Sequence, residues 1–200
     1  MENVNQLAEN ALAEGAAPYE AVMAGMAKGM EVVGRKYQEG ECFLPELLMA
    51  AETFKQGMNT LGPRLKSSDT PSQGRVVIGT VEGDLHDIGK NIVSVLLEAS
   101  GFEIFDLGVD VPSDRFTDRA KQVSADVIAM SALLTTAFPQ MKRVIETNRK
   151  SGSVARTIVG GAPLSEEVAK SIGADGYGRD AVEGANICKQ WIVRRRPSSQ

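Results

Sequence analysis

The chain has 200 residues, which is enough for one large domain or two small ones. Its 42% of hydrophobic and 24% of charged residues are ordinary for a globular protein, and a net charge of −4 argues against nucleic-acid binding, which usually needs a basic face. The two cysteines are widely spaced, which argues against a zinc site and a disulfide framework. The lack of a long apolar run argues against a membrane span. The chain begins MENVNQLAENALAEG, without the apolar core of a signal peptide, so we expect a cytoplasmic protein.

The first 66 residues repeat apolar side chains at helical spacing. The three stripes consist of Val4, Leu7, Ala8, Ala11 and Leu12; of Tyr19, Val22, Met23, Met26, Met30, Val33 and Tyr37; and of Leu44, Leu47, Leu48, Ala51, Phe54, Met58, Leu61 and Leu65. Short helices need neighbours to bury such stripes, so residues 1–66 are predicted to form a small helical bundle.

The sequence SSDTPSQG, residues 67–74, breaks this pattern and is predicted to be a linker. Residues 75–194 then alternate apolar strands with helices, and residues 195–200 are predicted to be a tail. The expected strands are 75–80, 103–108, 126–131, 156–161 and 174–178, and the expected helices are 88–100, 112–123, 138–150, one from about 165, and 179–194. Continuous apolar strands separated by helices predict an α/β domain with a doubly wound, flavodoxin-like, five-stranded parallel sheet.

The only histidine of the chain, His86, lies in a glycine-rich loop between the first strand and its helix. Ligands of such sheets lie at the carboxyl ends of the strands, and glycines let the backbone approach them closely. Asp84 is near enough in sequence to orient the imidazole, as is usual for a metal-bound histidine. One histidine cannot build a protein zinc site, so a metal would have to arrive in a macrocycle. A haem is possible in principle, but the glycine-rich loops suit a long nucleotide-like tail better.

These residues resemble a known family. GDLHDIG at 83–89 resembles the Asp-x-His-x-x-Gly signature of cobalamin-binding domains, and SAL at 131–133 and GG at 160–161 occur where that family has its other two motifs. GECFLPELLMAAETFKQGM at 40–58 is similar to the helical cap of the corrinoid domain of methionine synthase and of the corrinoid proteins of methyltransferase systems. The resemblance covers essentially the whole chain, with a cap domain at 1–66 and a cobalamin-binding domain at 75–194.

The resemblance implies that cobalamin, or another corrinoid, binds with His86 as the lower axial ligand of cobalt. His86 would replace the cofactor's own dimethylbenzimidazole, and Asp84 would accept a hydrogen bond from it. Ser131 and Thr135 would face the buried base, and Gly160 and Gly161 would leave room for the tail. The implied cofactor-binding residues are Gly83, Asp84, Leu85, His86, Asp87, Ile88, Gly89, Ser131, Leu133, Thr135, Gly160 and Gly161 from the α/β domain, and Tyr37, Leu44 and Leu47 from the cap, which would cover the upper face of the corrin.

The resemblance also implies a methyl carrier of one-carbon metabolism. Cobalt(I) would accept a methyl group from a substrate:corrinoid methyltransferase, and methyl-cobalt(III) would donate it through a second methyltransferase to tetrahydrofolate or a thiol. A reductive activase is a further expected partner, and neither nucleic acid nor membrane is expected. The chain has no segment left for a methyl-donor site, so we expect it not to be catalytic alone. Alternatives are a cobalamin-binding subunit of a radical mutase, a cobalamin-dependent sensor, and a plain cobalamin store or chaperone.

Two positions depart from the family pattern. In methionine synthase a serine extends the histidine–aspartate pair, and that position is Ala137 here. A water or another group is therefore expected to serve Asp84. Related corrinoid proteins also often carry one more helix before the stretch that begins this chain, which would alter the cap.

Overall fold

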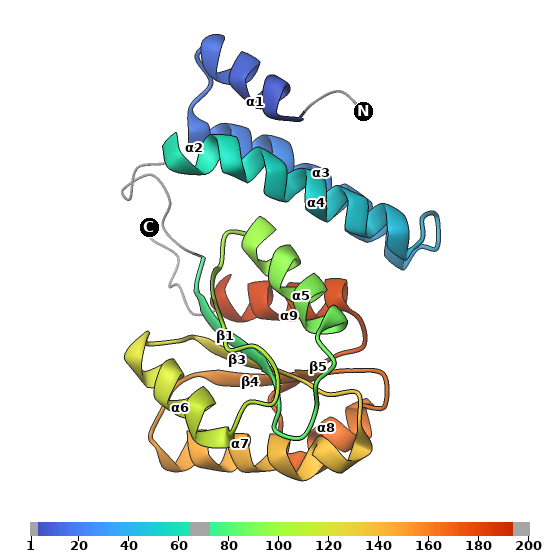
Figure 1. Cartoon of the computed structure of the whole chain (residues 1–200), viewed down its shortest axis with the longest axis vertical. Coiled ribbons are helices and arrows are strands. Elements are labelled where there is room, and N and C mark those ends of the chain that lie inside the picture. Colours follow the sequence, from blue (N-terminus) through green and yellow to red (C-terminus); the bar gives the residue numbers. More distant parts are fainter. Residues whose placement is uncertain (1–3, 65–72, 194–200) are drawn as a thin grey trace. The chain divides into compact units, whose positions relative to one another are not determined.

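The computed structural model describes residues 4–64 and 73–193 (Figure 1). The chain forms two compact units, which consist mainly of the described residues before and after this gap. Most of the predicted linker, 67–74, and the predicted tail, 195–200, lie outside the described residues. Within the described part of the chain, no helix has the length and apolar character needed to cross a membrane.

The first unit is helical, as predicted. Its α-helices are α1 (Val4–Ala13), α2 (Pro18–Glu20), α3 (Lys28–Gln38) and α4 (Leu44–Leu61), with a π-helical stretch η1 (Ala21–Ala27) between α2 and α3 and a 3₁₀ turn η2 (Gly62–Arg64) after α4. The second stripe therefore runs along one continuous helical segment from residue 18 to residue 38. Its π-helical part was not predicted, because apolar spacing alone does not report such a local widening of the helix.

The core of the helical unit is built on one face of α4. Leu47, Ala51, Phe54 and Leu61 are spaced at helical periodicity and are all buried. A Cβ atom at Gly57 would lie 2.6 Å from the Met26 sulfur, so Gly57 marks the place where this flexible side chain packs closely against α4. The predicted inward face of α1 is wrong in part. Only Ala8 of α1 is buried, and Leu7 is 52% exposed.

The second unit is the predicted five-stranded parallel sheet, with strand order β2-β1-β3-β4-β5. Its strands are β1 (Arg75–Thr80), β2 (Glu103–Asp106), β3 (Val127–Ser131), β4 (Arg156–Gly160) and β5 (Gly176–Gly178). Its helices are α5 (Ile88–Ala99), α6 (Ser113–Gln122), the short 3₁₀ helix η3 (Thr135–Ala137), α7 (Phe138–Lys150), α8 (Glu166–Ile172) and α9 (Ala181–Val193). Figure 1 shows α5 and α9 on one face of the sheet and α6, α7 and α8 on the other.

Local interactions explain the elements and their small deviations from prediction. β1 is buried throughout after Arg75, as a strand covered on both faces should be. Its Gly79 admits the ring of Phe116 from α6, because a Cβ atom there would lie 2.8 Å from that ring. α9 begins two residues later than predicted, since the Asp180 carboxylate accepts the Glu183 N–H at 2.8 Å and so caps the helix.

The strand order places a topological switch point between β1 and β3. The chain passes from β1 to β2 on one side of β1, and β3 then pairs with the other side. The loops after β1 and β3 therefore separate at the carboxyl edge of the sheet, which is where such folds bind ligands. His86 lies in the first of these loops.

Candidate functional site

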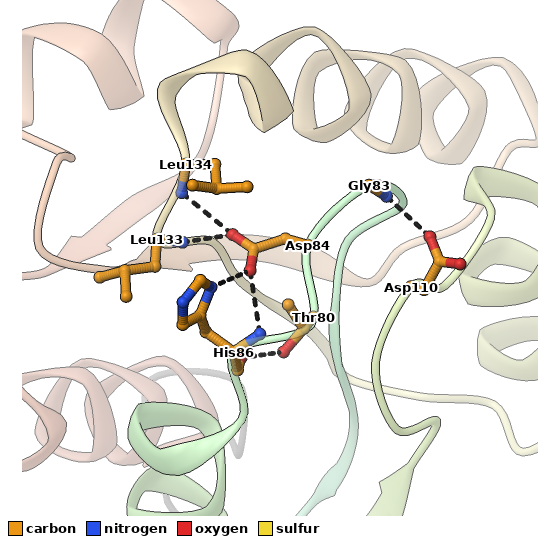
Figure 2. Close-up of polar contacts among 7 residues, drawn as sticks. All are labelled: Thr80, Gly83, Asp84, His86, Asp110, Leu133 and Leu134. Carbon is orange, nitrogen blue, oxygen red and sulfur yellow. Dashed lines mark hydrogen bonds and ion pairs between the residues drawn. The ribbon is translucent and has the colours of Figure 1, made fainter.

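The loop after β1 is held in place by the loop after β2. Gly83 adopts a φ of 86°, a left-handed conformation that favours glycine. Its N–H donates to Asp110 Oδ1 at 2.8 Å (Figure 2). The Asp110 N–H in turn donates to the Asp84 carbonyl at 3.0 Å. This reciprocal pair fixes the turn that leads into Asp84.

Asp84 is fully buried and accepts four hydrogen bonds (Figure 2). Its Oδ1 accepts the His86 N–H at 3.0 Å and lies 2.7 Å from His86 Nδ1. Its Oδ2 accepts the Leu133 N–H at 2.5 Å and the Leu134 N–H at 3.0 Å, both from the loop after β3. One carboxylate therefore joins the two loops on either side of the switch point.

These contacts define the protonation of the pair. Burial by itself raises the pKa of Asp84, but hydrogen bonds from the backbone of His86 and Leu133, the His86 ring and the Leu134 backbone outweigh it and lower the pKa to about 2. At neutral pH the ionised Asp84 carboxylate can accept hydrogen bonds but cannot donate one. The proton between the two side chains therefore belongs to His86 Nδ1. Nε2 then carries the lone pair that a metal needs.

The imidazole itself is accessible. The His86 side chain is 55% exposed although the carboxylate that holds it is fully buried. The His86 carbonyl accepts the Thr80 hydroxyl at 2.8 Å, so the main chain is held on both sides of an exposed ring (Figure 2). His86 is therefore an accessible imidazole whose main chain and Nδ1 are both held by neighbouring residues.

The surroundings of His86 fit a metal in a macrocycle. Among the described residues, no group of three or more His, Cys, Asp or Glu side chains could hold a metal ion by itself. The exposed hydrophobic side chains of the two loops include Leu85 and Ile88, both 72% exposed, and Leu133 and Leu134, 43% and 41% exposed. Exposed apolar side chains around one imidazole suit a large ring that brings its own equatorial ligands to the metal.

Ala137, which stands where methionine synthase has a serine, lies in η3 and is buried. The amides of Leu133 and Leu134 donate to Asp84 Oδ2. An amide N–H can hold a carboxylate but cannot exchange a proton with it as a hydroxyl does. The water or other group expected to serve Asp84 therefore stays a prediction.

The remaining predicted residues of the α/β domain lie along the same edge. Ser131 ends β3 and is half-buried, and Thr135 begins η3 and is exposed. Asp87 is exposed and accepts the Asn91 side-chain amide at 3.1 Å, at the start of α5. The exposed Gly89 lies in the first turn of the same helix.

The glycine pair after β4 has a structural reason of its own. A Cβ atom at Gly161 would lie 1.8 Å from the Ala132 carbonyl oxygen, and one at Gly160 would lie 3.3 Å from the Gly178 carbonyl oxygen. Gly161 also has a φ of 141°. Backbone packing alone therefore requires glycine at position 161, and the expected room for a cofactor tail stays a prediction.

The three predicted cap residues differ in exposure. Tyr37 is half-buried and Leu44 is 40% exposed, but Leu47 is 1% exposed and belongs to the buried face of α4. The exposed apolar residues at the start of α4 include Phe43 at 71% and Leu48 at 40%. A covering role stays a prediction for all three, and Leu47 would act by supporting this surface from inside the helical unit.

Three residues of the site were missed by sequence reasoning. Thr80 and Asp110 each hold the loop after β1, and Leu134 holds Asp84 together with Leu133. Thr80 had a signal, since it is a hydroxyl residue at the end of an otherwise apolar strand. The other two act through contacts between loops that no local pattern reports.

Comparisons with known proteins agree with this geometry. A family model described as a B12 binding domain matches residues 74–186, and a second with the same description matches residues 1–61. The trimethylamine corrinoid protein 1 of Methanosarcina acetivorans is 43% identical over 182 residues, which cover 89% of this chain and 84% of that protein.

Two solved structures are similar over most of the chain. A cobalamin-binding protein from Desulfitobacterium hafniense is 36% identical with a TM-score of 0.78, and the match covers 94% of this chain and 90% of that one. A chain of the methanol:cobalamin methyltransferase complex of Methanosarcina barkeri is 32% identical with a TM-score of 0.81, over 92% of this chain and 71% of that one. With a single supported imidazole at the switch point of its sheet, the chain belongs to the family of B12-binding corrinoid proteins.

Proposed function

We propose that this chain is a corrinoid methyl-carrier protein, which receives a methyl group from one methyltransferase and passes it on through another. The observation that carries the proposal is the His86–Asp84 pair, which presents one free imidazole nitrogen in an apolar setting. The corrinoid, when bound, supplies a nucleophilic cobalt that takes up and releases the methyl group. The chain supplies ligation, burial and access.

In this proposal His86 Nε2 would bind the cobalt of the corrinoid. The Asp84 carboxylate accepts the Nδ1 proton, which makes Nε2 a better electron donor and keeps the ring in one tautomer. The amides of Leu133 and Leu134 keep that carboxylate ionised and in place. The residues of this chain would thus hold His86 in one orientation toward the cofactor.

The helical unit is proposed to act as a cap. The side chains of Tyr37 and Leu44, with Leu47 in the buried core of the same unit, would exclude water from the upper face of the corrin. The cap would have to move aside to admit a partner enzyme. The names of the relatives point to partners that act on methylated amines or methanol. A reductive activase and a tetrahydrofolate- or thiol-dependent acceptor enzyme complete the proposal.

The ligand assignment is tested by spectroscopy of the loaded protein. Because His86 is the only histidine of the chain, protein purified without a histidine tag contains a single imidazole. We expect electron paramagnetic resonance of the cobalt(II) form to show one nitrogen ligand whose splitting pattern changes when the protein, and not the cofactor, is labelled with ¹⁵N. His86→Ala should lose this signal and still bind corrinoid. A pattern unaffected by protein labelling would assign the ligand to the cofactor's own base and reject His86.

The carrier role is tested with partner enzymes. We expect the loaded protein to take up a methyl group from trimethylamine or from methanol only when the corresponding methyltransferase is present, and to release it only with an acceptor enzyme. Uptake is followed by the change in corrinoid absorption, with the His86→Ala protein as the matched comparison. A loaded protein that stays unmethylated with the partner enzymes for both donors would contradict the proposed donor classes.

A further inference from the structure

Thr80 makes a contact with the loop after β1, which contains His86 and is called the ligand loop below. The pairing of Thr80 in the sheet does not require this contact. It is the last residue of β1 and is fully buried. Its N–H donates to the Gly108 carbonyl at 3.0 Å, and its own carbonyl accepts the Val111 N–H at 3.0 Å. These two bonds complete its backbone pairing. The hydroxyl is an additional donor, and it is used for the His86 carbonyl at 2.8 Å (Figure 2).

The contact completes a hold on both peptide groups of His86. The Asp84 carboxylate accepts the His86 N–H at 3.0 Å, and the Thr80 hydroxyl donates to the His86 carbonyl. The ring is 55% exposed, so packing contributes little to its orientation. The orientation of the His86 ring is therefore set by the main chain and by the contact of its Nδ1 with Asp84. Thr80 belongs to β1, which is paired with a neighbouring strand on each side, whereas His86 belongs to a loop.

We propose that Thr80 is a positioning residue, whose hydroxyl sets the main-chain orientation from which His86 approaches the cobalt. This inference rests on the proposed ligation by His86. Without the hydroxyl, the His86 carbonyl loses its partner, and the loop gains conformations in which the ring is misdirected. Preorganisation of a ligand by its supporting contacts is commonly worth about 10- to 100-fold in metal affinity, so ligation should weaken while the cofactor's tail remains bound.

The test separates the hydroxyl from the shape of the side chain. Thr80→Val keeps a β-branched side chain of similar size but cannot donate, and Thr80→Ser keeps the donor. The matched control is Thr157→Val. Thr157 is equally buried in β4, and its hydroxyl donates to Asp175 at 2.8 Å rather than to the ligand loop. The four proteins, including the parent, are loaded with cobalamin and their cobalt(II) spectra are compared. Hydrogen exchange of residues 82–92 is measured without cofactor.

We expect the ratio of histidine-bound to histidine-free cobalamin to fall about tenfold in Thr80→Val. It should be close to the parent value in Thr80→Ser and Thr157→Val. Exchange in residues 82–92 should be faster only in Thr80→Val. An unchanged ratio in Thr80→Val, or an equal fall in Thr157→Val, would overturn the role of Thr80. A parent protein that shows no histidine-bound cobalamin would instead reject the proposed ligation itself, so the two failures are distinguishable.

Discussion

Asp84 is the residue that joins the two loops of the site, those after β1 and β3. It supports the imidazole through Oδ1 and is itself supported by two amides through Oδ2. We predict that Asp84→Asn weakens histidine ligation or methyl transfer about 10- to 100-fold, because a neutral amide is a poorer acceptor for the Nδ1 proton. Transfer rates with saturating partner enzyme measure this. A native rate in Asp84→Asn would make the carboxylate purely structural.

The same carboxylate predicts a pH dependence of stability. Its pKa is lowered from 3.8 to about 2, so the folded state favours the ionised form. This contribution is present above about pH 4 and is lost as the pH falls through about 2, and its size is about 2 kcal/mol. Urea unfolding between these values should show this loss in the parent protein but not in Asp84→Asn. Parallel stability curves for the two proteins would contradict the assignment.

At the scale of single elements, a buried lysine ties α5 to β2. Lys90, in the first turn of α5, is 3% exposed, forms an ion pair with Asp106 at the end of β2, and donates to Asn91 Oδ1 at 2.7 Å. This connects the start of the helix after His86 to the sheet. The glycine-rich loop between them is thereby held at both ends, by Thr80 and by Lys90.

We predict that Lys90→Met lowers the free energy of unfolding by about 2 kcal/mol. The apolar side chain fits a buried position, but Asp106 loses its ion-pair partner and keeps the hydrogen bond from the Gly108 N–H. Because that carboxylate is 39% exposed, the loss is smaller than for a fully buried pair. The control is Lys142→Met, at an exposed position of α7, where a change within about 0.5 kcal/mol is expected. The free energies of unfolding of both variants are measured by urea unfolding. Equal values for Lys90→Met and Lys142→Met would show that the ion pair does not hold the helix.

At the scale of the whole molecule, the helical unit is proposed to act as a cap for the bound cofactor. We predict that Tyr37→Ala combined with Leu44→Ala speeds oxidation of the reduced cofactor without releasing it, since less apolar surface would then exclude water and oxidants. The control is Leu7→Ala, which removes an apolar side chain 52% exposed on α1 of the same unit. Oxidation is followed by absorption after mixing with air-saturated buffer. Equal lifetimes in the double variant and the parent would mean that these residues do not cover the cofactor.

Much of the fold was predictable because the signals are local. The apolar runs of β1 and β3 and the helical spacing of α7 report burial within a few residues of each position, and β1 and α7 have the predicted bounds. The pairing of Asp84 with His86 was predictable for the same reason, since the two residues are close in sequence. The resemblance to the motifs of cobalamin-binding domains then implied the chemistry that such a pair serves.

The sequence by itself therefore determined the succession of strands and helices along the chain. It also determined the single imidazole, the carboxylate beside it, and the edge of the sheet on which both lie. The tertiary structure decided what holds them: the Leu133 and Leu134 amides reach Asp84 from 49 and 50 residues away. It also enclosed Leu47 and left Leu7 exposed, although both belong to helical stripes. The physical reason is that periodicity records only that a side chain lies on an apolar face. Which group it meets depends on non-local strand pairing and helix packing, which no short stretch of sequence contains.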